Sequence, residues 1–224
     1  EMCIRDRVCT LLAAMRLPKG EAGGQTRLAE QIRTLRTRRL WGAYLTSGLI
    51  ICATFAAFSY CTPILIEEVG LAPGQVAPML ALYGVANLIG NMLVGRVADS
   101  HTISVVGLGL AMMVLVMSVF ALAGDNLWLN LSCFIAIGLT GVALNPAMVA
   151  RVMKAAEPGA LVNTLHTSVI TAGLAFGSWA GGAAIEAGYG LRAPLWVGAA
   201  IALLGLLSVL RPLASRHTAT TPCT

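Results

Sequence analysis

The feature that most constrains this chain is a series of long apolar runs separated by short polar stretches. Each run holds about 20 residues, and an α-helix of that length spans the roughly 30 Å hydrocarbon core of a bilayer. The sequence therefore predicts an all-α integral membrane protein, with a six-transmembrane-helix bundle over residues 41–211. The predicted spans cover residues 41–66, 77–97, 102–123, 127–150, 159–187 and 193–210.

Charge is scarce in this chain. Charged residues make up 11% of it, whereas a soluble domain carries about 25%. Hydrophobic residues reach 57% and the mean hydropathy is +0.79, which excludes an ordinary soluble domain. The net charge of +5 does not indicate nucleic-acid binding, because no aromatic residues alternate with the basic ones. The six cysteines lack CxxC or metal-ligand spacing, so we expect no metal and no cofactor.

The loop charges predict an orientation, because alternate loops of a helical bundle lie on opposite sides of the membrane. One side receives the basic cluster of residues 19–39 together with Arg96, Arg151, Lys154, Arg211 and Arg216. The other side receives one basic residue, Arg192, with Glu67, Glu68, Asp125 and Glu186. Since cytoplasmic loops carry the excess of lysine and arginine, we expect a multi-pass membrane protein with both bundle ends in the cytoplasm.

The first residues read as foreign sequence. EMCIRDR matches one reading frame of the transposon end used in sequencing libraries, GAGATGTGTATAAGAGACAG. We interpret residues 1–7 as a translated adapter; the alternative is a short basic leader. Residues 8–15 are apolar but too few to span a bilayer, as expected for the end of a truncated transmembrane helix. Residues 16–40 then form a basic cytoplasmic loop, and residues 212–224 a cytoplasmic tail.

Four strings within residues 40–210 carry a family resemblance: FAAFSYCTPILIEEVGL, GNMLVGRVADS, NTLHTSVITAGLAFGSWAGGAAIEAGYGL and APLWVGA. Together they resemble the C-terminal half of a major facilitator superfamily transporter. The most similar group is that of bacterial drug:proton antiporters, which includes arabinose and sugar efflux permeases and chloramphenicol efflux pumps. The resemblance implies a whole protein of two six-helix halves with the substrate bound between them. Residues 16–40 would be the loop that joins the halves.

The resemblance implies a fragment of a secondary active transporter that exports drugs or sugars across the inner membrane in exchange for protons. Its partners would be a small-molecule substrate, protons, the lipid bilayer and the missing N-terminal half of the same protein. One alternative is a standalone six-helix membrane protein or a half-transporter that dimerises. No Walker A loop is present, so an ATP-driven pump is not indicated.

Another alternative is an intramembrane enzyme, such as a rhomboid-like protease with Ser178 and His166 as a dyad. Ser178 lies in GSWA rather than in a GxSG context. His166 precedes it by twelve positions on the same predicted helix, about 18 Å of helical rise and beyond hydrogen-bonding distance. We therefore do not expect an enzyme.

Polar side chains within the predicted spans are candidates for a substrate cavity, because an unsatisfied amide that faces lipid is costly. For each the alternative is interhelical hydrogen bonding or ordinary core packing. His166 has the further property that an imidazole titrates near neutral pH, which suits proton or substrate handling. The candidates are Thr54, Phe58, Ser59, Tyr83, Asn87, Asn91, Asn145, His166, Thr167 and Thr171. Pro146, next to Asn145, favours a kink in the fourth span.

A tight polar turn at residues 98–101 is predicted between the second and third spans. Gly95, Arg96 and Asp99 there resemble the cytoplasmic loop motif of the superfamily, and we interpret them as a cytoplasmic gate. The alternative is a solvated turn whose arginine only sets the orientation. If the three residues form a latch, Asp99→Asn should impair transport without blocking membrane insertion.

Two further patterns complete the sequence predictions. Gly173, Gly177 and Gly181 recur at every fourth residue, which is the small-xxx-small pattern of closely packed membrane helices. No acidic residue lies near the middle of a predicted span. A proton-coupling carboxylate is therefore expected in the N-terminal half, as the resemblance implies.

Overall fold

The computed structural model describes residue 35 and residues 37–124, 126–156 and 159–217, with side chains up to residue 210. All regular secondary structure in these ranges is helical. The predictions for residues 1–7 and 8–15, and for most of 16–40 and of 212–224, fall on residues outside these ranges.

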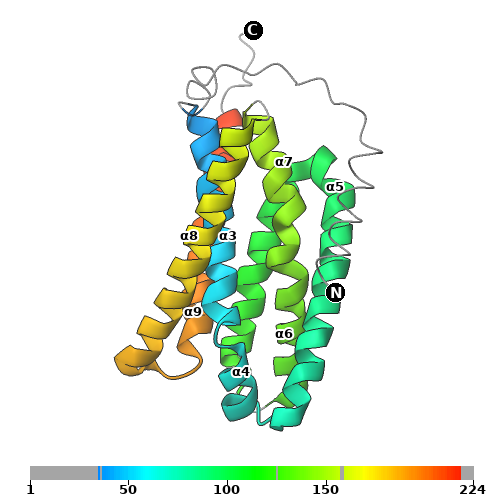
Figure 1. Ribbon diagram of the computed structural model, residues 1–224, viewed down its shortest axis with the longest axis vertical. Helices are drawn as coiled ribbons and strands as arrows, with labels where there is room; N and C mark the ends of the chain where they lie inside the picture. The colour runs from blue at the N-terminus through cyan, green and yellow to red at the C-terminus, as the bar shows by residue number, and fades with distance from the viewer. Residues whose placement is uncertain (1–34, 36, 125, 157–158, 218–224) are drawn as a thin grey trace, which may run out of the picture.

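The first membrane segment is a broken helix. α3 (Arg38–Phe58) ends at a turn at residues 59–60, and the single turn of α4 (Cys61–Pro63) leads into the π-helix η1 (Ile64–Glu68). The sequence predicted one continuous span here. The break reorients the last part of the segment at the end of the bundle opposite to the start of α3 (Figure 1).

α5 (Pro73–Leu122) joins the second and third predicted spans in 50 residues. The structure corrects the loop-like turn predicted at residues 98–101, because only His101 leaves the helical conformation, with φ −127° and ψ 41°. Figure 1 shows the chain running along one arm of α5 to this kink and back along the other arm towards the same end of the bundle. Polar side chains satisfy carbonyl groups there: the Thr102 hydroxyl donates to the Ala98 carbonyl, and the Lys154 ammonium donates to the Asp99 carbonyl. Because these bonds satisfy the carbonyl groups, a kink at one residue replaces a longer loop between the two arms.

The fourth membrane segment is also interrupted. α6 (Leu127–Thr140) ends at Gly141, the 3₁₀-helix η2 (Val142–Leu144) follows, and α7 (Asn145–Ala155) continues the path. Pro146 lies in the first turn of α7, where its missing N–H leaves no hydrogen bond broken. The kink expected from Pro146 is therefore present, but it lies at residues 141–144, just before the proline.

The last two segments form a helical hairpin. α8 (Ala160–Ala184) passes into the π-helix η3 (Ile185–Tyr189), and α9 (Ala193–His217) returns across the bundle. Gly188 and Gly190 both have positive φ, of 85° and 82°, a conformation that side chains with a Cβ rarely adopt. These glycines make the reversal between the two helices possible.

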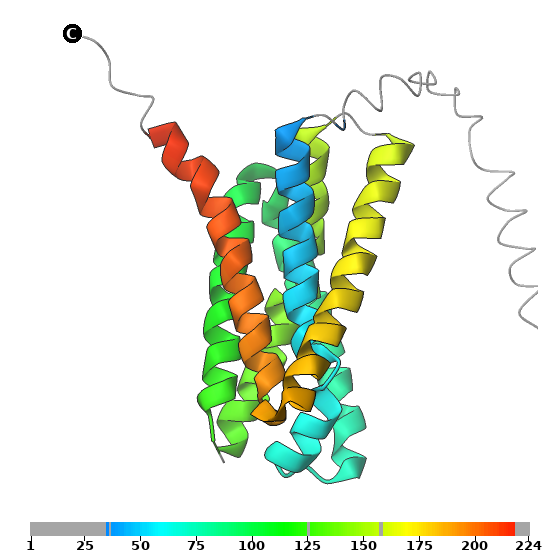
Figure 2. The same cartoon turned by 90° about the vertical axis from the view of Figure 1, so that its left-hand side faces the viewer.

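Five helices in the described ranges are long and apolar enough to cross a membrane. α5 supplies two crossings because its arms run in opposite directions (Figure 1), so the predicted all-α bundle of six membrane segments is confirmed. α3 packs against α8 and α9, while α5 packs against α6, α7 and α9. In Figure 2, α9 and α8 lie on opposite sides of α3.

The helices differ sharply in how much of their surface the bundle covers. In the most apolar window of α3, 67% of residues are buried, but in that of α8 only 11% are. The main core lies between α3, α5, α6 and α9 and contains Ile50, Leu110, Met113, Met117, Phe134 and Leu195. α8 is thus held mainly against α3, with a smaller contact to α9.

Candidate functional site

The open side of α8 carries a polar stripe. Asn163, Thr164, Thr167, Ser168 and Thr171 are all exposed and line a shallow groove that Ala172 and Ala175 complete. Three of the hydroxyl groups donate to the helix's own carbonyl groups four residues earlier, at 3.0–3.1 Å. These bonds use the hydroxyl protons and leave oxygen lone pairs free to accept. The stripe therefore presents acceptors and one amide to whatever covers this face. We call these five residues the α8 polar face.

Thr167 and Thr171 of this face were among the cavity candidates predicted from the sequence, whereas the other three residues were not. Asn163, Thr164 and Ser168 have the helical spacing of a common face with Thr167 and Thr171, and this spacing could have identified them from the sequence.

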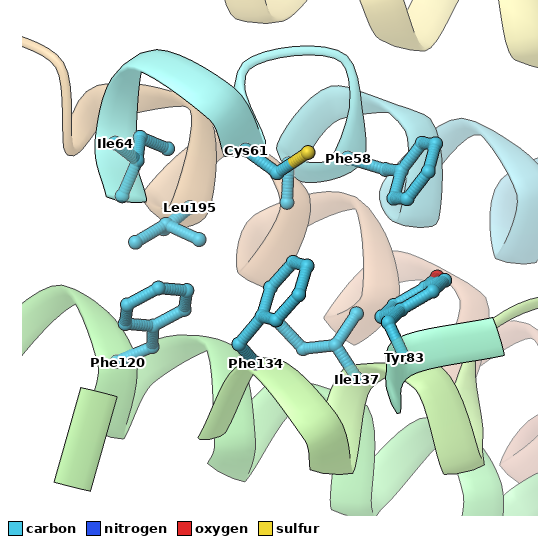
Figure 3. A pocket seen from close by; sticks show the side chains of 9 residues that line it. Phe58, Cys61, Ile64, Tyr83, Phe120, Phe134, Ile137 and Leu195 are labelled. Atoms are coloured by element: carbon cyan, nitrogen blue, oxygen red, sulfur yellow. The ribbon is translucent and has the colours of Figure 1, made fainter. Parts of the chain in front are cut away.

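The three polar residues predicted to share a face of the second span have different surroundings in the first arm of α5. Tyr83 is buried between Phe58 and Phe134, with ring centroids 5.0 and 5.1 Å away (Figure 3). Asn87 and Asn91 are half-buried. The tyrosine belongs to an aromatic cluster in the core, and only the two asparagines present polar groups towards the edge of the bundle.

Phe58 and Tyr83 also line a small apolar cavity, together with Cys61, Ile64, Phe120 and Leu195 among others (Figure 3). The cavity lies beside the break at residues 59–60. Its walls are aromatic and aliphatic except for Cys61. It offers no partner for a charged ligand.

Thr54 and Asn145 occupy opposite environments. Thr54 is fully buried, donates to the Ile50 carbonyl at 2.8 Å, and packs its methyl group against Gly141. It therefore supports the break between α6 and α7 from inside the core. Asn145, at the start of α7, is exposed.

Side chains anchor the break in the first segment to α8. One of them, Tyr60, was not among the candidates predicted from the sequence. The hydroxyl groups of Ser59 and Ser178 lie 2.7 Å apart, and the Tyr60 hydroxyl donates to the Ser178 carbonyl at 2.9 Å. The Tyr60 ring lies against Gly181 and Gly182, where a Cβ would collide with it. In the sequence, the adjacent glycines Gly181 and Gly182 were the feature that could have indicated a bulky side chain packed against α8.

His166 lies inside the bundle rather than on the α8 polar face. It is 4% exposed and stacks on Tyr44, with ring centroids 5.9 Å apart and an 18° angle between the planes. The Tyr44 hydroxyl donates to the Val162 carbonyl at 2.8 Å, so it does not serve the histidine. No described residue hydrogen-bonds to His166 Nε2. The imidazole also borders a pocket between α7 and α8 with Asn163 and Val152.

The structure separates the two residues of the enzyme alternative. Ser178 Oγ lies against Ser59, whereas the His166 ring stacks on Tyr44, and both belong to the single helix α8. This arrangement provides no serine–histidine contact. The described residues also contain no group of three histidine, cysteine or acidic side chains that could hold a metal ion.

At the kink of α5, Gly95, Arg96 and Asp99 are all exposed. Among the described residues the only ion pair joins Arg192 to Glu68, so Arg96 and Asp99 are not paired with each other. Lys154 makes the contact across this turn instead, to the Asp99 carbonyl and, at 2.8 Å, to the Thr102 hydroxyl. In the sequence, the feature that could have indicated this contact was the position of Lys154 in the last turn of a helix on the basic side of the bundle, where lysine can bond to free carbonyl groups.

The three spaced glycines of α8 face the backbone of α3. A Cβ at Gly173 would lie 2.6 Å from the Gly48 carbonyl oxygen, and a Cβ at Gly181 would lie 2.7 Å from the Ala56 carbonyl oxygen. A Cβ at Gly177 would come closer still to the Cys52 carbonyl oxygen. Real side chains do not tolerate such distances, so glycine lets the two helices approach this closely.

Comparison with known proteins gives a consistent result. The chain matches the family model of the Major Facilitator Superfamily over residues 8–162 and over residues 43–222. It is 33% identical over 195 residues to the inner membrane transport protein YdhP of Escherichia coli, covering 86% of this chain and 50% of that protein.

Two further relatives are named for what they confer or export. A chloramphenicol resistance protein of Streptomyces lividans is 25% identical over 209 residues, covering 89% of this chain and 53% of the relative. A probable sugar efflux transporter of Haemophilus influenzae is 28% identical over 207 residues, covering 90% of this chain and 50% of the relative. The chain spans about half the length of the curated relatives it matches.

Proposed function

The chain belongs to the major facilitator superfamily, and we propose that it forms one six-helix half of a transporter that exports a drug or a sugar across a bacterial inner membrane in exchange for protons. The observation that carries this proposal is the α8 polar face on a helix that the bundle leaves largely uncovered. Lipid is a poor environment for an exposed amide and a row of hydroxyl oxygens. A second helical half with a substrate pathway between the two would cover them.

The proposed substrate pathway runs along the α8 polar face. Asn87 and Asn91, half-buried on the first arm of α5, and Asn145, exposed at the start of α7, add amide groups. These groups recognise hydroxyl and carbonyl groups without regard to charge. They suit a neutral, oxygen-rich molecule, such as a sugar or an uncharged antibiotic.

Proton coupling is assigned to the other half. The described acidic residues lie at helix ends, with Glu67 and Glu68 in η1, Asp99 beside the kink of α5 and Glu186 in η3. None of the described membrane segments carries a carboxylate at its middle. A carboxylate that titrates during transport would therefore come from the half that this chain does not contain.

The proposed orientation has both bundle ends in the cytoplasm. The beginning of α3, the kink of α5 and the junction of α7 with α8 lie at one end of the bundle (Figure 1). The basic residues Arg38, Arg39, Arg96, Arg151 and Lys154 lie there, whereas Glu67, Glu68, Glu186 and Arg192 lie at the opposite end. This distribution of charge supports a cytoplasmic location of the basic end.

Transport by inverted membrane vesicles tests the proposal. Vesicles from cells that express the complete gene should accumulate labelled chloramphenicol or a labelled sugar when their interior is made acidic. A protonophore should abolish the accumulation, and vesicles without the protein should show none. Uptake that does not depend on the pH gradient would contradict proton exchange. The absence of uptake for both substrate classes would contradict the proposed substrates.

A further inference from the structure

Arg192 bonds to two other segments at the end of the bundle that carries Glu67 and Glu68. It lies in the short connection between η3 and α9, and its side chain is 20% exposed. Nε donates to Glu68 Oε2 at 2.8 Å, and Nη2 donates to the Gly124 carbonyl at 2.8 Å. One guanidinium therefore contacts two other segments of the bundle, the end of η1 and the connection between α5 and α6.

Both partners of Arg192 are themselves fixed. The Gly124 carbonyl also accepts from Asn130 Nδ2, at 3.0 Å, so two donors hold it. Glu68 belongs to η1, and the backbone that follows it is bonded back to the helix, from Val69 N–H to the Ile64 carbonyl and from Leu71 N–H to the Leu65 carbonyl. Arg192 thus bonds to a carbonyl and to a segment that other hydrogen bonds already hold in place.

The same three segments also meet through apolar side chains. Ile64 of η1, Phe120 near the end of α5 and Leu195 near the start of α9 are nearly fully buried and border one small cavity (Figure 3). The polar contacts of Arg192 and this apolar contact therefore join the same elements.

We propose that Arg192 is a staple that makes the three segments at this end of the bundle move as one body. Arginine suits this role because its planar guanidinium presents several N–H donors in fixed directions, so it can bond a carboxylate and a carbonyl at once. A lysine keeps the charge but presents no such fork. The pair with Glu68 is partly shielded from solvent, and this shielding strengthens it relative to a fully exposed pair.

Hydrogen exchange of the protein in lipid nanodiscs tests the staple. In Arg192→Gln, amide exchange should become about tenfold faster in all three segments, residues 64–72, 122–127 and 188–194, which corresponds to about 1.4 kcal/mol of local opening free energy. Arg192→Lys should show a smaller increase. Glu68→Ala should accelerate residues 64–72 alone, because the bond from Arg192 to Gly124 is left in place.

Glu67→Gln is the matched control, since Glu67 is the exposed neighbour of Glu68 and makes no ion pair among the described residues. It should leave all three segments unchanged. Acceleration confined to residues 188–194 in Arg192→Gln would overturn the proposal. If that variant does not fold, an unchanged exchange rate in Glu68→Ala would overturn it equally. The measurement needs no substrate, so its outcome is independent of the transport assay.

Discussion

Replacing Gly177 with leucine is expected to detach α8 from α3 and to lower the free energy of unfolding by about 3 kcal/mol, the upper range for overpacking a closely packed site. Even the first side-chain atom would collide with the Cys52 carbonyl oxygen, and a backbone atom cannot turn aside as a flexible side chain can. Apart from a smaller contact with α9, α8 has little else to hold it, because most of its surface is uncovered. The midpoint of thermal unfolding in detergent measures the loss.

Gly84→Leu is the matched control for this substitution. Gly84 also lies within a membrane segment, on the first arm of α5, but a Cβ there meets no atom within 4 Å. The same added side chain should leave the unfolding midpoint nearly unchanged. Equal losses in the two variants would show that leucine disturbs these helices for a reason other than the contact between α8 and α3.

Thr167→Leu is expected to reduce transport at least tenfold while the protein inserts and folds as before. The tenfold loss corresponds to about 1.4 kcal/mol, the order expected when one hydrogen bond to a substrate is removed. Thr167 is exposed in the middle of the α8 polar face, and its hydroxyl bonds only to its own helix, so leucine breaks no contact with another helix. Initial transport rates, normalised to the amount of folded protein, measure the effect.

The control for this prediction lies on the other side of the same helix. Phe176 is 57% exposed and follows Thr167 by nine residues, which places it about 180° around α8. Phe176→Leu should therefore keep transport unchanged. Full transport by Thr167→Leu would indicate that the α8 polar face borders lipid or another protein surface rather than the substrate pathway.

Much of the fold follows from the sequence because bilayer thickness fixes helix length. The apolar runs predicted all six membrane segments, and the family resemblance is confirmed by the match to the Major Facilitator Superfamily. The local interruptions of the helices could not be predicted from the sequence. His101 alone reverses α5, because Thr102 and Lys154 satisfy carbonyl groups at the kink. The Lys154 contact joins residues 55 positions apart, so it leaves no local signal in the sequence.

The candidate site was less predictable, because helical spacing identifies a shared face without saying what that face meets. Thr167 and Thr171 lie on an open face, as a pathway requires, whereas Thr54 and His166 turn inward to the core. Their roles in transport stay predictions. Arg192 looked like a single exception to the positive-inside pattern, and only the fold shows that it lies beside Glu68.

Transport by separately expressed halves tests the central claim most directly. The chain should be produced alone and together with the six-helix segment that we propose precedes it in the gene, and proton-dependent export of labelled chloramphenicol or sugar should be measured in both cases. The chain alone should insert into the membrane and export nothing, and the two halves together should restore export. Export by the chain alone, at the rate of the combined halves, would contradict the claim that it is half of a transporter.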